Sequence, residues 1–130
     1  MKVKRLKIRE VLATNSHKTI EVELQTEKGS VRASVPIGTS RGKYEVSYLP
    51  VDRALLKFDI IKRHFTAEQL ADQKEVDELL RIVDKTPDFK EIGGNLALAI
   101  SSVFLKAFAL ENNQEVFQFL SPKPSMPKPI

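Results

Sequence analysis

Cysteine and tryptophan are absent from this sequence of 130 residues, and histidine occurs only twice, as His17 and His64. Without cysteine the chain has no disulfide framework, no thiolate metal site and no thiol nucleophile. Two histidines cannot form a multi-histidine metal centre. We therefore expect a protein of a reducing compartment, with the cytoplasm as the default location.

Long apolar runs are missing as well. The richest stretch, residues 96–110, is interrupted by Ser101, Ser102 and Lys106, and falls short of the roughly 18 apolar residues of a membrane span. Residues 1–7 carry positive charge but no apolar stretch follows them, unlike a signal peptide. We expect a single soluble domain without a membrane segment.

Charge is divided unevenly between the two halves of the chain. Residues 1–65 hold 14 Lys and Arg against 7 Asp and Glu, and residues 66–130 hold 7 against 10, so the halves carry +7 and −3 within the net +4. A basic half indicates either an anionic partner, such as RNA, DNA or a phosphorylated metabolite, or simply a solvated surface.

The first third of the chain has the two-residue periodicity of β-strands. Apolar and polar residues alternate in residues 19–25 and again in residues 31–35, on either side of a turn at residues 27–30. Residues 6–12 alternate in the same way. These patterns predict a three-stranded antiparallel sheet with one packed face.

The remainder has the periodicity of helices. We expect a helix over residues 54–65 and a second after a capping box formed by Asp72 and Glu75, with its apolar positions from Val76 to Val83. A third should begin after residues 93–95 and run to about Glu111, and a short last one should cover residues 115–120. The third should be the central, most buried helix. The predicted face of the first is Leu55, Leu56, Ile60 and Ile61, and the predicted aromatic core is Phe104, Phe108, Phe117 and Phe119. Strands followed by helices indicate an α+β fold.

The last ten residues differ in composition from the rest. Residues 121–130 contain four of the seven prolines, which exclude both helix and central strand. We interpret residues 1–120 as the domain and residues 121–130 as a proline-rich linker or tail.

The segment with the composition of a functional site is the loop at residues 36–45. Gly38 and Gly42 flank the hydroxyls of Thr39 and Ser40 and the cation of Arg41, directly after a strand. Such a loop offers backbone N–H groups, hydroxyls and positive charge to a phosphate or a metal-bound anion, and it is equally compatible with an ordinary mobile loop. It lacks the residue order of a Walker loop.

No self-sufficient catalytic group emerges from the remaining polar residues. We expect both histidines to be exposed, and the carboxylates of Glu21, Glu23, Glu75, Asp77 and Glu78 to face water on a strand and a helix.

Taken in order, these segments resemble the N-terminal domain of enolase. The strand and turn of residues 20–29 match first, followed by the loop of residues 35–45, whose family pattern is Val-Pro-Ser-Gly-Ala-Ser-Thr-Gly-x-Tyr-Glu. The helix of residues 72–84 matches the pattern Asp-Gln-x-x-Ile-Asp-x-x-Leu, and residues 86–101 match Gly-Thr-x-x-Lys-x-x-Leu-Gly-Ala-Asn-Ala-Ile-Leu-x-Val-Ser. Residues 116–130 match Leu-Tyr-Arg-Tyr-Leu and then Leu-Pro-x-Pro. The match extends over nearly the whole chain.

The resemblance implies Mg²⁺-dependent interconversion of 2-phosphoglycerate and phosphoenolpyruvate, a lyase reaction of glycolysis, in a complete enolase. The family's base, acid and principal Mg²⁺ carboxylates lie in a C-terminal (β/α)₈ barrel. The resemblance therefore implies no catalytic residue in this chain. It implies a loop that closes on the site, Gly38, Thr39, Ser40, Arg41 and Gly42, in which Ser40 binds a second Mg²⁺ only when barrel and substrate are present.

Some positions depart from the family pattern. Ile37 replaces a serine, Thr39 an alanine and Arg41 a threonine, and residues 13–19 keep only the last residue of Asp-Ser-Arg-Gly-Asn-Pro-Thr. These departures lie where the family makes barrel and subunit contacts. The change from Gly-Ala-Asn to Gly-Gly-Asn at residues 93–95 is expected to be mild.

Three functions fit these observations. The first is an enolase-like protein that is non-catalytic alone, as a paralogue or as a half that pairs with a separate barrel. The second is the N-terminal part of a true enolase, and the third is a basic module that binds nucleic acid or an acidic protein. The expected cofactor is Mg²⁺ where a barrel completes the site and none otherwise, and the expected partners are an enolase barrel or a second copy of the chain.

Overall fold

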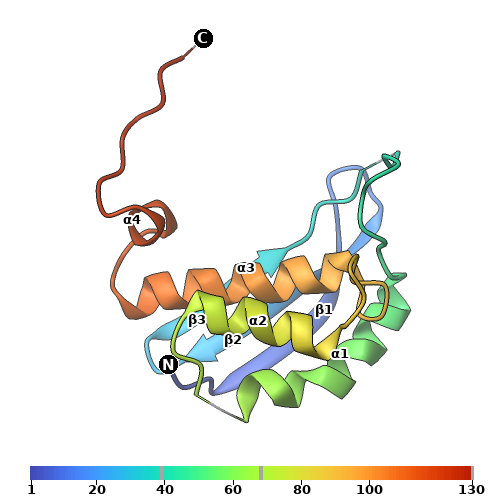
Figure 1. Cartoon of the computed structure of the whole chain (residues 1–130), viewed down its shortest axis with the longest axis horizontal. Coiled ribbons are helices and arrows are strands. Elements are labelled where there is room, and N and C mark those ends of the chain that lie inside the picture. The colour runs from blue at the N-terminus through green and yellow to red at the C-terminus, as the bar shows by residue number, and fades with distance from the viewer. Residues whose placement is uncertain (39, 68, 130) are drawn as a thin grey trace.

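A computed structural model describes residues 1–38, 40–67 and 69–129. A three-stranded antiparallel sheet comes first, with β1 at Arg5–Leu12, β2 at Lys18–Thr26 and β3 at Gly29–Ser34 in the spatial order β1-β2-β3. Four helices follow, α1 at Val51–Thr66, α2 at Gln73–Val83, α3 at Gly94–Glu111 and α4 at Val116–Leu120. Figure 1 shows the helices on one face of the sheet. The α+β prediction is confirmed.

Alternation along β2 decides which face of the sheet is buried. Ile20, Val22 and Leu24 are fully buried, and Val22 lies between Ile8 of β1 and Ala33 of β3 in the register of the strands. Helix α3 covers this face from β2 to β3, and α1 packs near β1. The core therefore lies between the sheet and α3.

Helix α3 is buried over most of its circumference, as its composition predicts. Leu96, Ile100, Val103 and Phe104 are fully buried along its length. By length and composition alone α3 could cross a membrane, yet 61% of that window is buried inside the domain. Its apolar surface is used by the core, and it does not establish a membrane location. At the β3 edge of the sheet, the Lys106 ammonium of α3 donates a hydrogen bond to the Arg32 carbonyl over 2.7 Å.

The predicted face of α1 is wrong for Leu56 and Ile60, although Ile61 is buried as predicted. The buried residues of the helix are Ala54, Phe58, Ile61 and Phe65, whereas Leu56 and Ile60 are 66% and 61% exposed. The two phenylalanines determine the rotation of the helix, because Phe65 packs against Phe104 with 6.1 Å between ring centroids. Large rings bury more apolar area than aliphatic side chains, so they occupy the core-facing side.

Phe117 is a second correction, because it is 59% exposed and lies outside the core. The short helix α4 directs Phe119 onto Phe108, with ring centroids 6.4 Å apart and planes inclined by 11°. Residues two apart on a helix point about 200° apart, so Phe117 faces water.

The capping box before α2 is present in a modified form. Asp72 Oδ1 accepts a hydrogen bond from the Glu75 N–H over 2.9 Å, as predicted. Glu75 Oε2 accepts in return from the N–H of Ala71, one residue before the N-cap, over 2.8 Å. The start of the helix is thus fixed from both sides.

Residues 121–129 contain no helix or strand, and Figure 1 shows them leading away from α4 and the body of the domain. Ile130 lies outside the described residues.

Candidate functional site

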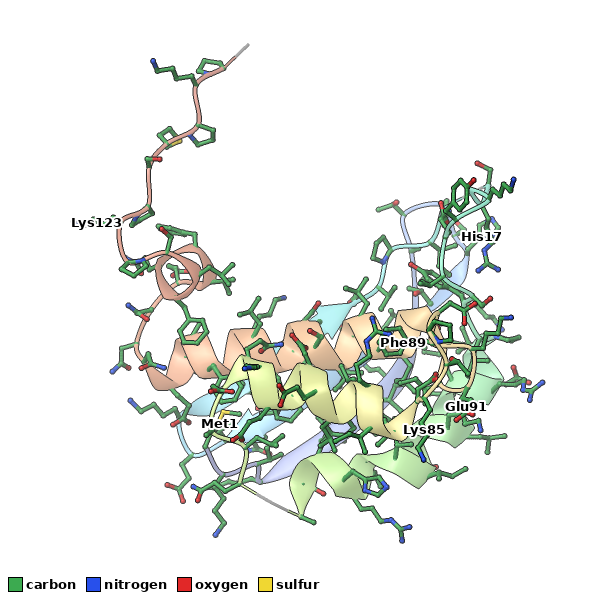
Figure 2. The ribbon with its side chains drawn as sticks, viewed as in Figure 1. Met1, His17, Lys85, Phe89, Glu91 and Lys123 are labelled. Carbon is green, nitrogen blue, oxygen red and sulfur yellow. The ribbon has the colours of Figure 1, made fainter. Side chains whose placement is uncertain are left out.

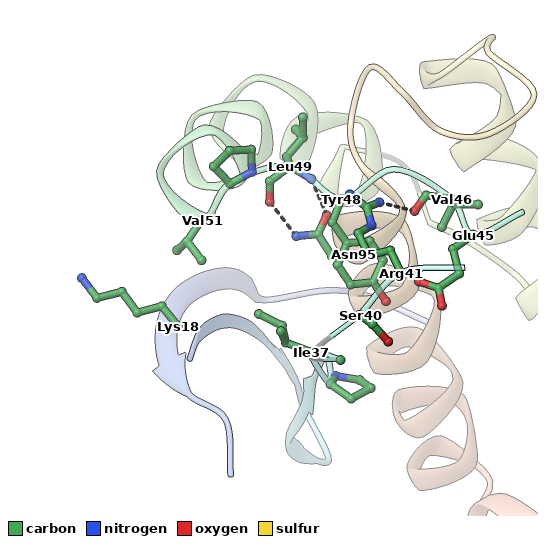
Figure 3. A pocket seen from close by; sticks show the side chains of 13 residues that line it. Lys18, Ile37, Ser40, Arg41, Glu45, Val46, Tyr48, Leu49, Val51 and Asn95 are labelled. Carbon is green, nitrogen blue, oxygen red and sulfur yellow. Dashed lines mark hydrogen bonds between the residues drawn. The ribbon is translucent and has the colours of Figure 1, made fainter. Parts of the chain in front are cut away.

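Residues 36–38 and 40–50, between β3 and α1, lie beside the β1–β2 turn at one end of the sheet (Figure 1). They surround an open hollow of about 620 Å³, and Figure 3 shows the side chains around it. Its polar lining includes Lys18, Ser40, Arg41, Glu45 and Asn95. Three of the predicted loop residues, Gly38, Ser40 and Arg41, line it together, whereas Gly42 does not, and Thr39 lies outside the described residues.

Asn95, in the first turn of α3, fixes the far end of this loop. Its Nδ2 donates to the Leu49 carbonyl over 3.0 Å, and its Oδ1 accepts from the Leu49 N–H over 3.1 Å (Figure 3). The Gly94 N–H donates to the Ser47 carbonyl over 2.7 Å. The loop is therefore anchored to the central helix.

The two glycines before Asn95 allow this close approach. Gly93 has φ +86°, a conformation that other residues rarely adopt. A Cβ at Gly94 would lie 2.2 Å from Val46 Cγ2, far inside contact distance. The glycine at position 94, expected to be a mild change from the family's alanine, is in fact matched to Val46 of the loop.

Arg41 folds back across its own loop. Its Nη2 donates to the Val46 carbonyl over 2.7 Å, and its guanidinium carbon lies 5.7 Å from the centroid of the Tyr48 ring. Both distances fit a hydrogen bond combined with a cation–π contact. The arginine thereby ties residue 41 to residues 46–48, leaving Ser40 exposed at the rim of the hollow.

The turn that departs from the family pattern is joined to the loop by Asn15. Its Oδ1 accepts from the His17 N–H over 3.1 Å, and its Nδ2 donates to the Ile37 carbonyl over 3.1 Å. Ser16 has φ +65°, which closes the turn. The two altered segments thus meet in space, a contact that sequence analysis missed.

The comparison with protein families identifies this architecture. The family model for "Enolase, N-terminal domain" matches residues 3–120. The chain belongs to the enolase N-terminal domain family.

Known enolases share this domain at moderate identity. The enolase of Methanosphaera stadtmanae is 32% identical over 119 residues, which cover 88% of this chain and 29% of that enzyme. The enolase of Methanocorpusculum labreanum is 35% identical over 116 residues, covering 87% and 29%, and that of Thermoplasma acidophilum is 29% identical over 133 residues, covering 98% and 33%. The chain spans about a third or less of the length of these relatives.

In this enolase N-terminal domain, a buried carboxylate organises the approach to Gly93. Asp84, fully buried after α2, accepts hydrogen bonds from the Thr86 N–H and hydroxyl at 2.9 and 2.5 Å and from the N–H groups of Glu91 and Ile92 at 3.0 and 2.9 Å. Burial opposes ionisation, but these bonds outweigh it and hold the pKa of Asp84 below its ordinary value. The Asp-x-Thr pattern is the sequence signal that could have identified it.

The carboxylates on the outer sheet face are engaged rather than simply hydrated, which corrects the expectation for Glu21 and Glu23. Glu21 accepts from the Ser34 hydroxyl over 2.8 Å and pairs with Arg9. The Ser34 bond, opposed by partial burial and reinforced by Arg9, lowers the pKa of Glu21. Glu23 pairs with Arg32 over 3.2 Å. Part of the positive charge of the first half is thus neutralised across neighbouring strands.

The other predicted polar residues lie apart from the hollow. Both histidines are exposed, as are Glu75 and Glu78 on α2. Asp77 is also exposed, but it accepts hydrogen bonds from the Ser101 hydroxyl over 2.7 Å and from Gln73 over 3.1 Å. Within residues 1–38, 40–67 and 69–129, no three of His, Cys, Asp and Glu gather closely enough to hold a metal ion.

Proposed function

We propose that this domain forms the lid half of an enolase-type active site and is non-catalytic alone, acting as a paralogue or as a half that pairs with a separate barrel. The observation that carries the proposal is the loop with two glycines and an exposed Ser40, anchored to α3 by Asn95. A loop fixed at its far end and open at its tip can move over a neighbouring site and exclude water from it.

The residues of the hollow can supply part of the coordination of a Mg²⁺ ion. Mg²⁺ requires octahedral coordination by oxygen, and Ser40 offers one hydroxyl oxygen. Among the described lining residues the carboxylate is that of Glu45, and the cations are those of Lys18 and Arg41. The remaining oxygens have to come from a barrel, from substrate and from water. Bound there, Mg²⁺ would supply positive charge that stabilises negative charge on the substrate.

This chain's own residues then position the lid. Arg41 holds the loop against residues 46–48, and Asn95 holds Leu49 on α3, so Ser40 is displayed from a supported segment. Lys18 adds positive charge at the rim, which favours an anionic substrate such as a phosphorylated acid. We place this activity in the cytoplasm.

A second candidate is the N-terminal part of a full-length enolase, with the barrel in the same polypeptide. The relatives favour it, since the chain covers 29% of the M. stadtmanae enzyme. Ser40 and the loop would have the same role in either form.

Complementation tests the proposal. The purified chain is mixed with the separately produced barrel of the M. stadtmanae enolase, and the formation of phosphoenolpyruvate from 2-phosphoglycerate is followed with Mg²⁺. We expect no turnover by the chain alone, turnover by the mixture, and a loss of about tenfold or more with Ser40→Ala. Leu120→Ala, at an exposed residue of α4, serves as the control.

Each outcome decides between the forms. Turnover by the chain alone contradicts the assignment as a lid. An inactive mixture, together with an active single-chain fusion of the same two parts, favours the second candidate. Inactivity of both contradicts any lid function.

A further inference from the structure

A groove between α1 and α2 is bordered by exposed apolar side chains. It has a volume of about 360 Å³ and a base of Ile61, Leu79, Val83 and Ile92. Ile60 of α1 and Ile82 of α2 line it while being 61% and 65% exposed, and Leu56 lies one turn before Ile60. Figure 1 shows the two helices side by side. Two large apolar side chains exposed in one groove, with Leu56 exposed beside it on α1, are typical of an interaction site.

Basic side chains accompany this apolar surface along α1. Arg53, Lys57, Arg63 and His64 share the stripe of Leu56 and Ile60, because they follow each other at helical spacings of three and four residues. Lys57, His64 and Glu91 also line the groove. Among the described residues of α1, the ion pair joins Lys62 to Asp59 and involves none of the four basic side chains. The positive charge of the stripe is therefore left for a partner.

The charge distinguishes between possible occupants. A second copy docked through a two-fold axis along α1 would oppose the basic stripe to itself, and like charges at an interface disfavour that pairing. An acidic partner gains from the same charges. A helix is the element that fits between two helices, presenting apolar residues at positions i, i+3, i+4 and i+7.

We infer that the α1–α2 groove binds an acidic amphipathic helix of a partner protein. Its apolar stripe packs on Leu56, Ile60 and Ile82, and its flanking carboxylates face Arg53, Lys57 and Arg63. This surface is separate from the hollow at Ser40, so the inference is independent of the lid function.

The test uses two designed helical peptides that have the same leucine stripe and differ only in the flanking residues, Glu in one and Lys in the other. Binding of each fluorescently labelled peptide to the intact chain is measured by anisotropy. We expect saturable binding of the Glu peptide, weaker by about tenfold or more for the Lys peptide, and weakening with added salt.

Variants of the chain locate the binding. Ile60→Glu and Lys57→Glu should each weaken binding of the Glu peptide by about tenfold, whereas Leu12→Glu, at a residue 71% exposed on the sheet, should leave it unchanged. Circular dichroism confirms that each variant is folded. Equal binding of the two peptides, or binding insensitive to Ile60→Glu, would overturn the inference. A native dimer dissociated by Ile60→Glu would assign the groove to a second copy and overturn it also.

Discussion

The side chain of Asn95 pairs with both backbone polar groups of Leu49, although 46 residues separate them. Leu49 lies outside any strand or helix, so its N–H and carbonyl have no partners in regular secondary structure. The single side-chain amide of Asn95 takes the place of those partners. The start of the central helix and the end of the loop become one mechanical unit.

Replacement of Asn95 by alanine should therefore lower the free energy of unfolding by about 1–3 kcal/mol, because it leaves the Leu49 N–H and carbonyl without their partners. Urea unfolding measures the change. Gln114→Ala, at an exposed residue beyond α3, is the matched control and should change the free energy little. An unchanged midpoint for Asn95→Ala would show that water replaces the amide without cost.

Gly94→Ala should be destabilising by about 1–3 kcal/mol, because the added methyl group overlaps Val46. The double variant Gly94→Ala with Val46→Ala should recover part of the loss, since the overlapping Cγ2 is removed. Gly42→Ala is the control, because a Cβ there lies 3.6 Å from the Glu45 side chain, an ordinary contact. Strict additivity in the thermal unfolding of the double variant would argue against direct contact.

Stability should depend on Asp84 at acidic pH. Because the folded-state pKa of Asp84 is lowered, its contribution is present above the ordinary aspartate pKa and is lost as the pH falls through the folded-state value. Asp84→Asn should lower the free energy of unfolding by about 2 kcal/mol at neutral pH, and by less as the solution becomes acidic. Urea titrations across the acidic range compare the two proteins. A constant difference at all pH values would mean that the charge of Asp84 is irrelevant.

Ile37→Glu should weaken association through the loop face. The half-buried side chain lines the hollow, while its carbonyl accepts from Asn15, a bond that the substitution leaves in place. We predict a homodimer or a complex with a barrel on this face, which sedimentation velocity detects. Leu120→Glu, at an exposed residue of α4, is the control. A chain that stays monomeric and does not bind the barrel would contradict this prediction.

Features set by residues close together in the sequence could be predicted, whereas features set by contacts between distant residues could not. Residues adjacent in sequence set the alternation of Ile20, Val22 and Leu24 and the capping at Asp72, so both could be predicted. The face of α1 depends on where Phe58 and Phe65 meet other elements, and local aliphatic spacing predicted Ile61 correctly but placed Leu56 and Ile60 wrongly.

The site divides in the same way. The loop at residues 36–45 was recognisable from its glycines and its resemblance, but its attachments were not. Those attachments, Asn15 to Ile37 and Asn95 to Leu49, join residues that are distant in sequence. Asp84 carried a local signal, Asp-x-Thr, because its first partner is two residues away.

The bond from Lys106 to the Arg32 carbonyl has a consequence for how the molecule behaves in a crowded solution. Edge strands are templates for further strands, and a sheet that accepts them grows into aggregates. At β3 the ammonium occupies a carbonyl that an incoming strand would need. At the other edge, β1 presents the exposed charges of Arg5, Lys7 and Arg9, which an incoming strand would have to accommodate. A sheet of three strands is thereby kept from recruiting a fourth.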